Sequence, residues 1–165
     1  MDWTKDFQRV LPLHVDAINE AIRGLPERIR VHFCYGSYAS SHLTDPDYSK
    51  VLQGLLRIRA GTIVGEMPKR RHDDDLLIIK NHIKEYGWPK DIKFAAGVID
   101  VKSPIVETPE TISLKLRNLA DIYEIGPERV LGGTDCGFET FSGLGSVPKT
   151  IALNNLRSLA MGARL

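Results

Sequence analysis

Apolar positions along the chain follow two alternating periodicities. Five segments carry apolar residues at helical spacing and are predicted to form amphipathic helices: 6–25, 47–60, 73–87, 108–126 and 147–165. Four shorter runs between them are rich in β-branched, aromatic and small apolar residues, which is typical of strands: 28–36, 61–66, 92–101 and 129–137. The pattern therefore predicts one helix followed by four strand–helix units.

Local signals mark the ends of several predicted helices. Pro12 either starts or kinks the first one, and Gly24 and Pro26 follow its end. The acidic run 73–75 begins the third helix, where the helix dipole favours negative charge, and we interpret it as a solvated helix start. Thr108 or Thr111 is the expected N-cap of the fourth.

Strands that alternate with helices predict a parallel sheet with right-handed crossovers, so the expected fold class is α/β. No linker or low-complexity stretch divides the chain, and we expect one domain over 1–165. Four strands cannot close a barrel alone. The chain is therefore either half of a (β/α)₈ barrel or an open doubly wound sheet, and both folds place their chemistry at the carboxyl ends of the strands.

Composition and charge narrow the class of protein. The 165 residues are 42% hydrophobic and 26% charged, which is ordinary for a folded domain. Lys and Arg number 22 against 21 for Asp and Glu, and this balance gives no field that favours nucleic acid or an anionic membrane. No run approaches the roughly 20 apolar residues of a membrane span, and the polar start predicts no signal peptide. We expect a cytoplasmic protein whose two cysteines are thiols or metal ligands.

Metal-ligating residue types gather at the predicted strand ends. In "RVHFCYGSY", 30–38, His32 and Cys34 are two apart, so their side chains point to the same side of an extended strand. Glu66 ends the second strand and Cys136 ends the fourth. Two sulfurs, an imidazole and a carboxylate form a candidate tetrahedral zinc shell, in which an exchangeable carboxylate leaves room for a substrate.

Each of these residues also has a structural explanation. Free cysteines are among the most buried residues, and a histidine on an apolar strand is often a satisfied core residue. Glu66 could cap the segment that follows it, and Cys136, between Asp135 and Gly137, could belong to a turn. The His-x-Cys spacing lacks the specificity of paired C-x₂-C motifs, so the metal hypothesis rests on the coincidence of four ligand types at one edge.

Four stretches resemble, in order and spacing, the carboxyl-terminal half of the cobalamin-independent methionine synthase family: "HVDAINEAIRGLPERIRVHFCYGS", "RIRAGTIVGEMPKRRHDDD", "GVIDVKSPIVETPE" and "ERVLGGTDCGFET". The resemblance runs from about residue 6 to the end. It implies the second half of a (β/α)₈ barrel and one Zn²⁺ held by His32, Cys34, Glu66 and Cys136. These are the residues that the strand-end positions also select.

The resemblance further implies transfer of a methyl or other alkyl group to a thiol. In the family the thiol is homocysteine and the donor is a methylated folate, which makes these small molecules the expected partners. A thiol is mostly protonated at neutral pH, and binding to zinc converts it to the nucleophilic thiolate. Release of Glu66 on arrival of the substrate would keep coordination near four.

Other positions differ from the family pattern or match it only in part. A histidine that is thought to assist proton transfer is replaced by Lys102 in "IDVKS", a cation less suited to neutral pH that could equally be an exposed surface charge. Asp100 and Asp135 are candidates for orienting a substrate amine or a ligand, with structural hydrogen bonding as the alternative. Arg71 and His72 match an R-H pair of some relatives and are assigned a role at the rim of the site.

The first half of the barrel has no counterpart in this chain. Four open units would expose two strand edges and an apolar sheet face, so we expect a homo-oligomer or a complementary half-barrel chain. The alternative function is a non-catalytic zinc-binding fragment or subunit. A small-ligand protein with an open sheet is less favoured, because no G-x-G-x-x-G loop follows any strand.

Overall fold

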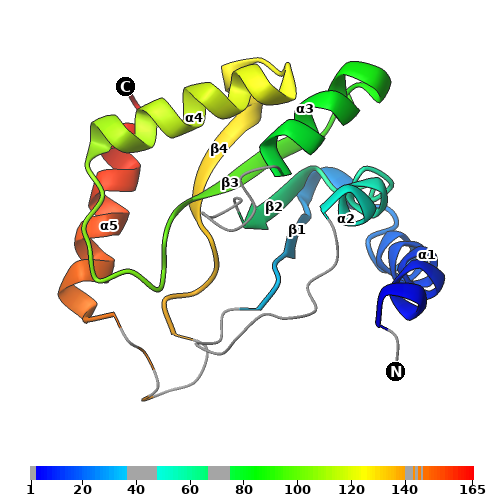
Figure 1. The fold of residues 1–165 in the computed structure, drawn as a ribbon, viewed down its shortest axis with the longest axis horizontal. Coiled ribbons are helices and arrows are strands. Elements are labelled where there is room, and N and C mark those ends of the chain that lie inside the picture. Colours follow the sequence, from blue (N-terminus) through cyan, green and yellow to red (C-terminus); the bar gives the residue numbers. More distant parts are fainter. Residues whose placement is uncertain (1–2, 37–47, 67–74, 140–142, 144, 146) are drawn as a thin grey trace.

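The computed structural model describes residues 3–36, 48–66, 75–139, 143, 145 and 147–165. Within these residues, helices and strands alternate (Figure 1). In chain order the elements are α1 (Trp3–Ala21), η1 (Pro26–Arg28), β1 (Arg30–Phe33), α2 (Tyr48–Leu55), β2 (Thr62–Glu66), α3 (Asp75–Tyr86), β3 (Lys93–Ile99), α4 (Pro109–Tyr123), η2 (Pro127–Arg129), β4 (Val130–Thr134) and α5 (Lys149–Gly162). The predicted order of helix and strands is confirmed.

The four strands form one sheet in the order β1-β2-β3-β4, and all three pairs are parallel. The predicted α/β class is therefore confirmed. The helices lie in an arc along the outer side of the sheet (Figure 1). Because neighbouring parallel strands all run the same way, their carboxyl ends meet at one edge, which positions the candidate residues together.

The core lies between β3 and the helices. β3 is buried along almost its whole length, as the apolar run 92–101 predicts for a strand covered on both faces. Phe94 of β3 packs against Tyr123 of α4 with ring centroids 4.6 Å apart, and Trp88 lies 5.0 Å from Tyr123. The indole Nε1 of Trp88 donates a hydrogen bond to the carbonyl oxygen of Ile92 at 2.8 Å, so this buried polar group is satisfied.

Two glycines identify the face of the sheet that packs on the helices. A Cβ on Gly65 would lie 2.5 Å from the Phe33 ring, and a Cβ on Gly132 would lie 2.8 Å from Leu159 of α5. Since side chains alternate along a strand, the residues next to these glycines point to the opposite, inner face. His32 and Glu66 belong to this inner set, because His32 pairs with Val64, one residue before Gly65.

Several boundaries differ from the predicted ones. α1 begins at Trp3 and continues through Pro12, so this proline does not start the helix. α2 ends at Leu55, and the following residues turn back so that Ile58 and Ala60 are buried. Thr108 is the N-cap of α4, and its side chain accepts a hydrogen bond from the backbone N–H of Thr111 at 3.2 Å. Of the described helices, none has the length and apolar character that crossing a membrane requires.

Candidate metal centre

Three residues that are distant in sequence meet at the carboxyl edge of the sheet. His32 lies in β1, Cys34 follows the end of β1, and Cys136 lies in the loop two residues after β4. Their ligand atoms all lie within 4.8 Å of one another. The Sγ atom of Cys136 is 3.5 Å from Nε2 of His32. β1 and β4 are the two outer strands of the sheet, so curvature of the sheet brings their ends together.

The donor set and its spacing fit a zinc ion. With Zn–S bonds of about 2.3 Å and Zn–N bonds of about 2.0–2.1 Å, neighbouring sulfur and nitrogen atoms of a tetrahedral shell are about 3.5 Å apart. The Cys136–His32 separation of 3.5 Å equals this value. Thiolate and imidazole groups are also donors that zinc prefers. His32 and Cys34 are exposed, which leaves one side of the cluster open to solvent.

Glu66 lies beside this cluster rather than within it. The pairing of Phe33 with Gly65 places Glu66 level with Cys34. Its Oε2 atom accepts a hydrogen bond from the backbone N–H of Tyr35 at 3.4 Å. The carboxylate therefore holds the chain immediately after Cys34.

The environment of Cys136 disfavours its thiolate when no cation is present. Burial raises the pKa of the Cys136 thiol to about 12, and contact with Cys34 and the negative charges of Glu66 and Asp135 act in the same direction. A thiol with this pKa is protonated at neutral pH. A divalent cation reverses the balance, because the same negative groups that oppose the thiolate attract the cation.

Asp135 is held against the middle of the sheet. Only 2% of its surface is exposed, and its backbone N–H donates a hydrogen bond to the carbonyl oxygen of Ile99 at 3.1 Å. A Cβ on Gly97 would lie 2.6 Å from both the Cα and the Oδ1 atoms of Asp135. Gly97 therefore permits the close approach of the loop that carries Cys136. Sequence analysis did not select Gly97, although a glycine inside an apolar strand is the signal for such an approach.

Asp100 and Lys102 lie in the loop after β3. Asp100 Oδ1 accepts a hydrogen bond from the backbone N–H of Lys102 at 2.8 Å. The Nζ atom of Lys102 reaches the carbonyl oxygen of Gly36 at 3.4 Å, and Gly36 has a positive φ of 100°. Lys102 thus connects the loop after β3 with the segment after Cys34, a role that the sequence did not suggest.

Residues that the sequence analysis did not select hold the loop between β3 and α4 in place by hydrogen bonds and an ion pair. Glu107 Oε1 accepts a hydrogen bond from the backbone N–H of Asp100 at 3.3 Å, and Lys115 forms an ion pair with Glu107. The fully buried Asn155 of α5 accepts a hydrogen bond from the N–H of Glu107 at 2.8 Å and donates one to the carbonyl oxygen of Ile105 at 3.0 Å. The loop therefore has a defined path between β3 and α4.

Arg71 and His72, the remaining candidates, lie outside the described residues.

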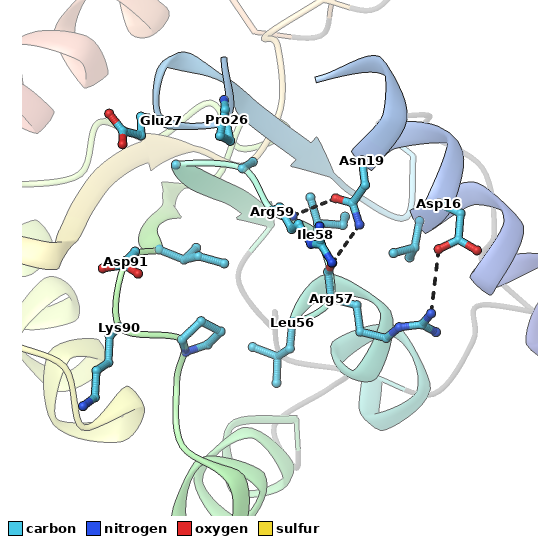
Figure 2. Close-up of a pocket in the computed structure, with 15 residues that line it drawn as sticks. Asp16, Asn19, Pro26, Glu27, Leu56, Arg57, Ile58, Arg59, Lys90 and Asp91 are labelled. Atoms are coloured by element: carbon cyan, nitrogen blue, oxygen red, sulfur yellow. Dashed lines mark hydrogen bonds and ion pairs between the residues drawn. The ribbon is translucent and has the colours of Figure 1, made fainter. Parts of the chain in front are cut away.

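A cavity of about 670 Å³ lies at the amino ends of the strands, opposite the candidate metal centre (Figure 2). It is lined by residues of α1, η1 and the segments that lead into β2 and β3. Figure 2 shows that Asn19 connects α1 to the segment before β2. Its side chain donates a hydrogen bond to the carbonyl oxygen of Arg57 at 3.0 Å and accepts one from the N–H of Arg59 at 2.8 Å. Because βα folds carry their chemistry at the carboxyl ends of strands, we interpret these contacts as structural.

Comparisons with known proteins find methionine synthases among the relatives of this chain. The chain is 29% identical over 156 residues to a methionine synthase of Saccharolobus solfataricus, covering 92% of this chain and 38% of that protein. It is 26% identical over 151 residues to a methionine synthase of Sulfurisphaera tokodaii, covering 92% and 37%. No family model matches the chain. The chain spans less than half the length of these relatives.

A solved structure shares the fold. The B12-independent methionine synthase of Shewanella sp. W3-18-1, solved in complex with selenomethionine, superposes with a TM-score of 0.69 at 23% identity. The match covers 96% of this chain and 44% of that one. The parallel four-stranded sheet therefore matches part of a (β/α)₈ barrel rather than an open doubly wound sheet. Similarity over nearly the whole chain, in sequence and in fold, supports the resemblance to the cobalamin-independent methionine synthase family and to the carboxyl-terminal half of its members.

Proposed function

We propose that this chain forms the zinc-binding half of a catalyst that transfers a methyl or other alkyl group to a thiol such as homocysteine, with a methylated folate as the donor. The observation that carries the proposal is the convergence of His32, Cys34 and Cys136, whose ligand atoms lie within 4.8 Å of one another. Similarity to methionine synthases supports the choice of reaction.

Three residues would hold the ion, and Glu66 is the proposed fourth ligand. His32 and Cys34 are exposed and approach from β1, whereas Cys136 approaches from the loop after β4. Glu66 would join them in place of its hydrogen bond from the Tyr35 N–H. When bound, zinc supplies the positive charge that lowers the pKa of a substrate thiol, so that the thiol reacts as a thiolate at neutral pH.

The surrounding carboxylates give this edge a preference for a substrate with an ammonium group. Asp135 is buried directly behind Cys136, and Asp100 follows β3 on the same edge. An amino-acid thiol carries such an ammonium group, and a carboxylate binds an ammonium group by a charge-assisted hydrogen bond. Lys102 holds the segment after Cys34 through Gly36, and its ammonium group is the candidate acid of the site.

A second candidate function is that of a non-catalytic zinc-binding subunit. The observation that favours it is coverage: the chain corresponds to 38% of the Saccharolobus relative and 44% of the Shewanella structure. The described strands line only one side of the metal cluster, and in a (β/α)₈ barrel the opposite strands and their loops would complete the pocket. Under this alternative the chain binds zinc but does not turn over substrate.

The test of the metal site is the zinc content of the purified chain together with X-ray absorption at the zinc edge. We expect one zinc per chain with two sulfur neighbours. Cys34→Ser and Cys136→Ser should each remove one sulfur, and His32→Ala should weaken binding. The matched control is His82→Ala on α3, where the His82 ring lies 4.7 Å from the ring of Tyr86, away from the cluster. Unchanged sulfur coordination in both cysteine variants would refute the proposed ligand set.

Turnover separates the two candidate functions. Methyl transfer from a methylated folate to homocysteine should require both zinc and a partner that completes the barrel. If the chain binds zinc and forms the completed barrel but shows no methyl transfer, the subunit alternative is the better description.

A further inference from the structure

Glu107, which lies shortly before α4, uses both of its carboxylate oxygens. Oε1 accepts a hydrogen bond from the backbone N–H of Asp100 at 3.3 Å, and Oε2 forms an ion pair with Nζ of Lys115 on α4. The same Nζ atom donates a hydrogen bond to the carbonyl oxygen of Val98 at 2.9 Å. Only 17% of the Glu107 side chain is exposed, so protein groups rather than water hold this carboxylate. Glu107 therefore ties the end of β3 and the loop after it to α4.

Hydrogen bonds continue from this carboxylate toward the metal cluster. Oδ1 of Asp100 accepts a hydrogen bond from the backbone N–H of Lys102 at 2.8 Å, and Nζ of Lys102 donates one to the carbonyl oxygen of Gly36 at 3.4 Å. Gly36 is two residues after Cys34, a candidate metal ligand. A continuous series of contacts thus runs from Glu107 through Asp100 and Lys102 to the segment that carries Cys34. A change at Glu107 can reach the cluster by this route.

The backbone of Glu107 is held in addition by α5. The side chain of Asn155, which is fully buried, accepts a hydrogen bond from the N–H of Glu107 at 2.8 Å and donates one to the carbonyl oxygen of Ile105 at 3.0 Å. Figure 1 shows the segment between β3 and α4 passing beside α5 before α4 begins. Because α5 holds its backbone and α4 holds its side chain, Glu107 has a fixed position from which it can place Asp100.

The ion pair with Lys115 also sets the charge beside Asp100. Glu107 and Asp100 are both acidic, and two carboxylates in one partly buried loop repel each other. The ammonium group of Lys115 cancels the charge of Glu107. Glu107 therefore holds the backbone of Asp100 without adding an uncompensated negative charge beside it, and this arrangement suits Asp100 to the ammonium group of a substrate.

A residue that only stabilised the loop would change the free energy of unfolding and leave the metal centre as it is. We propose instead that Glu107 is a positioning residue of the metal centre: through Asp100 and Lys102 it sets the position of the segment that carries Cys34. This role deepens the proposed function and rests on it in taking the cluster to be a zinc site. The hydrogen bonds involve protein groups alone, so they can be followed in the metal-free chain.

The first measurement is the carbonyl carbon resonance of Gly36 by NMR, in the chain kept metal-free by a chelator. Lys102→Met removes the hydrogen bond to this carbonyl group and gives the reference shift. In Glu107→Gln both partners of the side chain are donors, but an amide offers one acceptor oxygen, so one contact is lost. We expect Glu107→Gln to move the Gly36 resonance in the same direction as Lys102→Met. The matched control is Glu110→Gln, at an exposed acidic residue in the first turn of α4, which should leave the resonance unmoved.

The second measurement is zinc affinity, by competition with a chromophoric chelator. Lys102→Met and Glu107→Gln should each weaken zinc binding several-fold. The double variant should bind zinc no more weakly than the weaker of the two single variants, because both residues act along one series of contacts. Losses that multiply in the double variant would show that the two residues act independently, and this result would overturn the proposal.

Glu107→Asp is the second variant in case Glu107→Gln does not fold. It keeps the charge but is one methylene shorter and cannot span both contacts, so it should move the Gly36 resonance in the same direction. An unmoved Gly36 resonance in the folded Glu107 variants, or an equal movement in Glu110→Gln, would also overturn the positioning role. A wild-type chain that binds no zinc but shows the expected Gly36 shifts would contradict the proposed function alone.

Discussion

Gly97 of β3 lies in direct contact with Asp135 of the loop after β4. The absent side chain is what allows this contact, because a Cβ on Gly97 would lie 2.6 Å from the Cα and Oδ1 atoms of Asp135. Cys136 is the next residue, so the position of a candidate zinc ligand depends on a glycine in a neighbouring strand.

Gly97→Ala should therefore displace the loop and weaken zinc binding at least tenfold, with a loss of stability of about 1–3 kcal/mol from overpacking. Gly133→Ala is the matched control, because Gly133 pairs with Gly97 in register and its Cβ would meet one atom at an ordinary 3.5 Å. Zinc titration and thermal unfolding of both variants measure the effect. Equal zinc affinities in the two variants would contradict this account.

Asn155 provides a prediction for the loop after β3. Asn155→Ala should cost about 1–3 kcal/mol in the free energy of unfolding, because the N–H of Glu107 and the carbonyl oxygen of Ile105 lose a buried partner. Urea unfolding measures the cost, and amide exchange should increase between residues 105 and 107. Asn154→Ala is the control, since Asn154 is an exposed neighbour that accepts a hydrogen bond from Arg157. A cost no larger than that of the control would show that the loop is held by other contacts.

The contrast between Asn154 and Asn155 shows what the sequence can predict. Hydrophobic periodicity is a local property, and it predicts the order of helices and strands and the carboxyl-edge position of His32, Cys34 and Glu66 correctly. Two adjacent asparagines in a helix look equally solvent-exposed, and only the packing of α5 against the loop after β3 makes one of them fully buried. Contacts of this kind depend on how elements pack, which periodicity does not encode.

The same limit applies to the candidate site. The residue types and strand ends predict which ligands share an edge, but not that Cys136 lies beyond the end of β4 or that Glu66 bonds to the Tyr35 N–H. The distance between Cys136 and His32 depends on the curvature of the whole sheet. The role of Lys102 as a link to Gly36 likewise requires the positions of two loops that are far apart in sequence.

The pKa of Cys136 predicts how the metal-free chain responds to pH. This thiol has a pKa of about 12 in the folded chain against an ordinary value of 9.0, because burial and nearby negative groups disfavour the thiolate. Above about pH 9 the unfolded chain loses this proton while the folded chain keeps it, so the free energy of unfolding should fall as pH rises from about 9 toward 12.

Urea unfolding at a series of pH values, with a chelator and a reductant present, measures this dependence. Cys136→Ser removes the titrating group and should flatten the curve over the same range. A wild-type curve that matches the serine variant would contradict the raised pKa.

Lys102 is predicted to position the segment after Cys34 in addition to any part in proton transfer. Its Nζ atom lies 3.4 Å from the carbonyl oxygen of Gly36, and Gly36 is two residues from Cys34. Lys102→Met keeps much of the side-chain volume but removes this hydrogen bond, so zinc affinity should fall several-fold, whereas Lys102→Arg keeps a donor and should retain most of the affinity. Zinc titration of the isolated chain measures both variants without reference to turnover. A residue that acts only as a proton donor would leave the zinc affinity of Lys102→Met unchanged, and that result would restrict Lys102 to the chemical step.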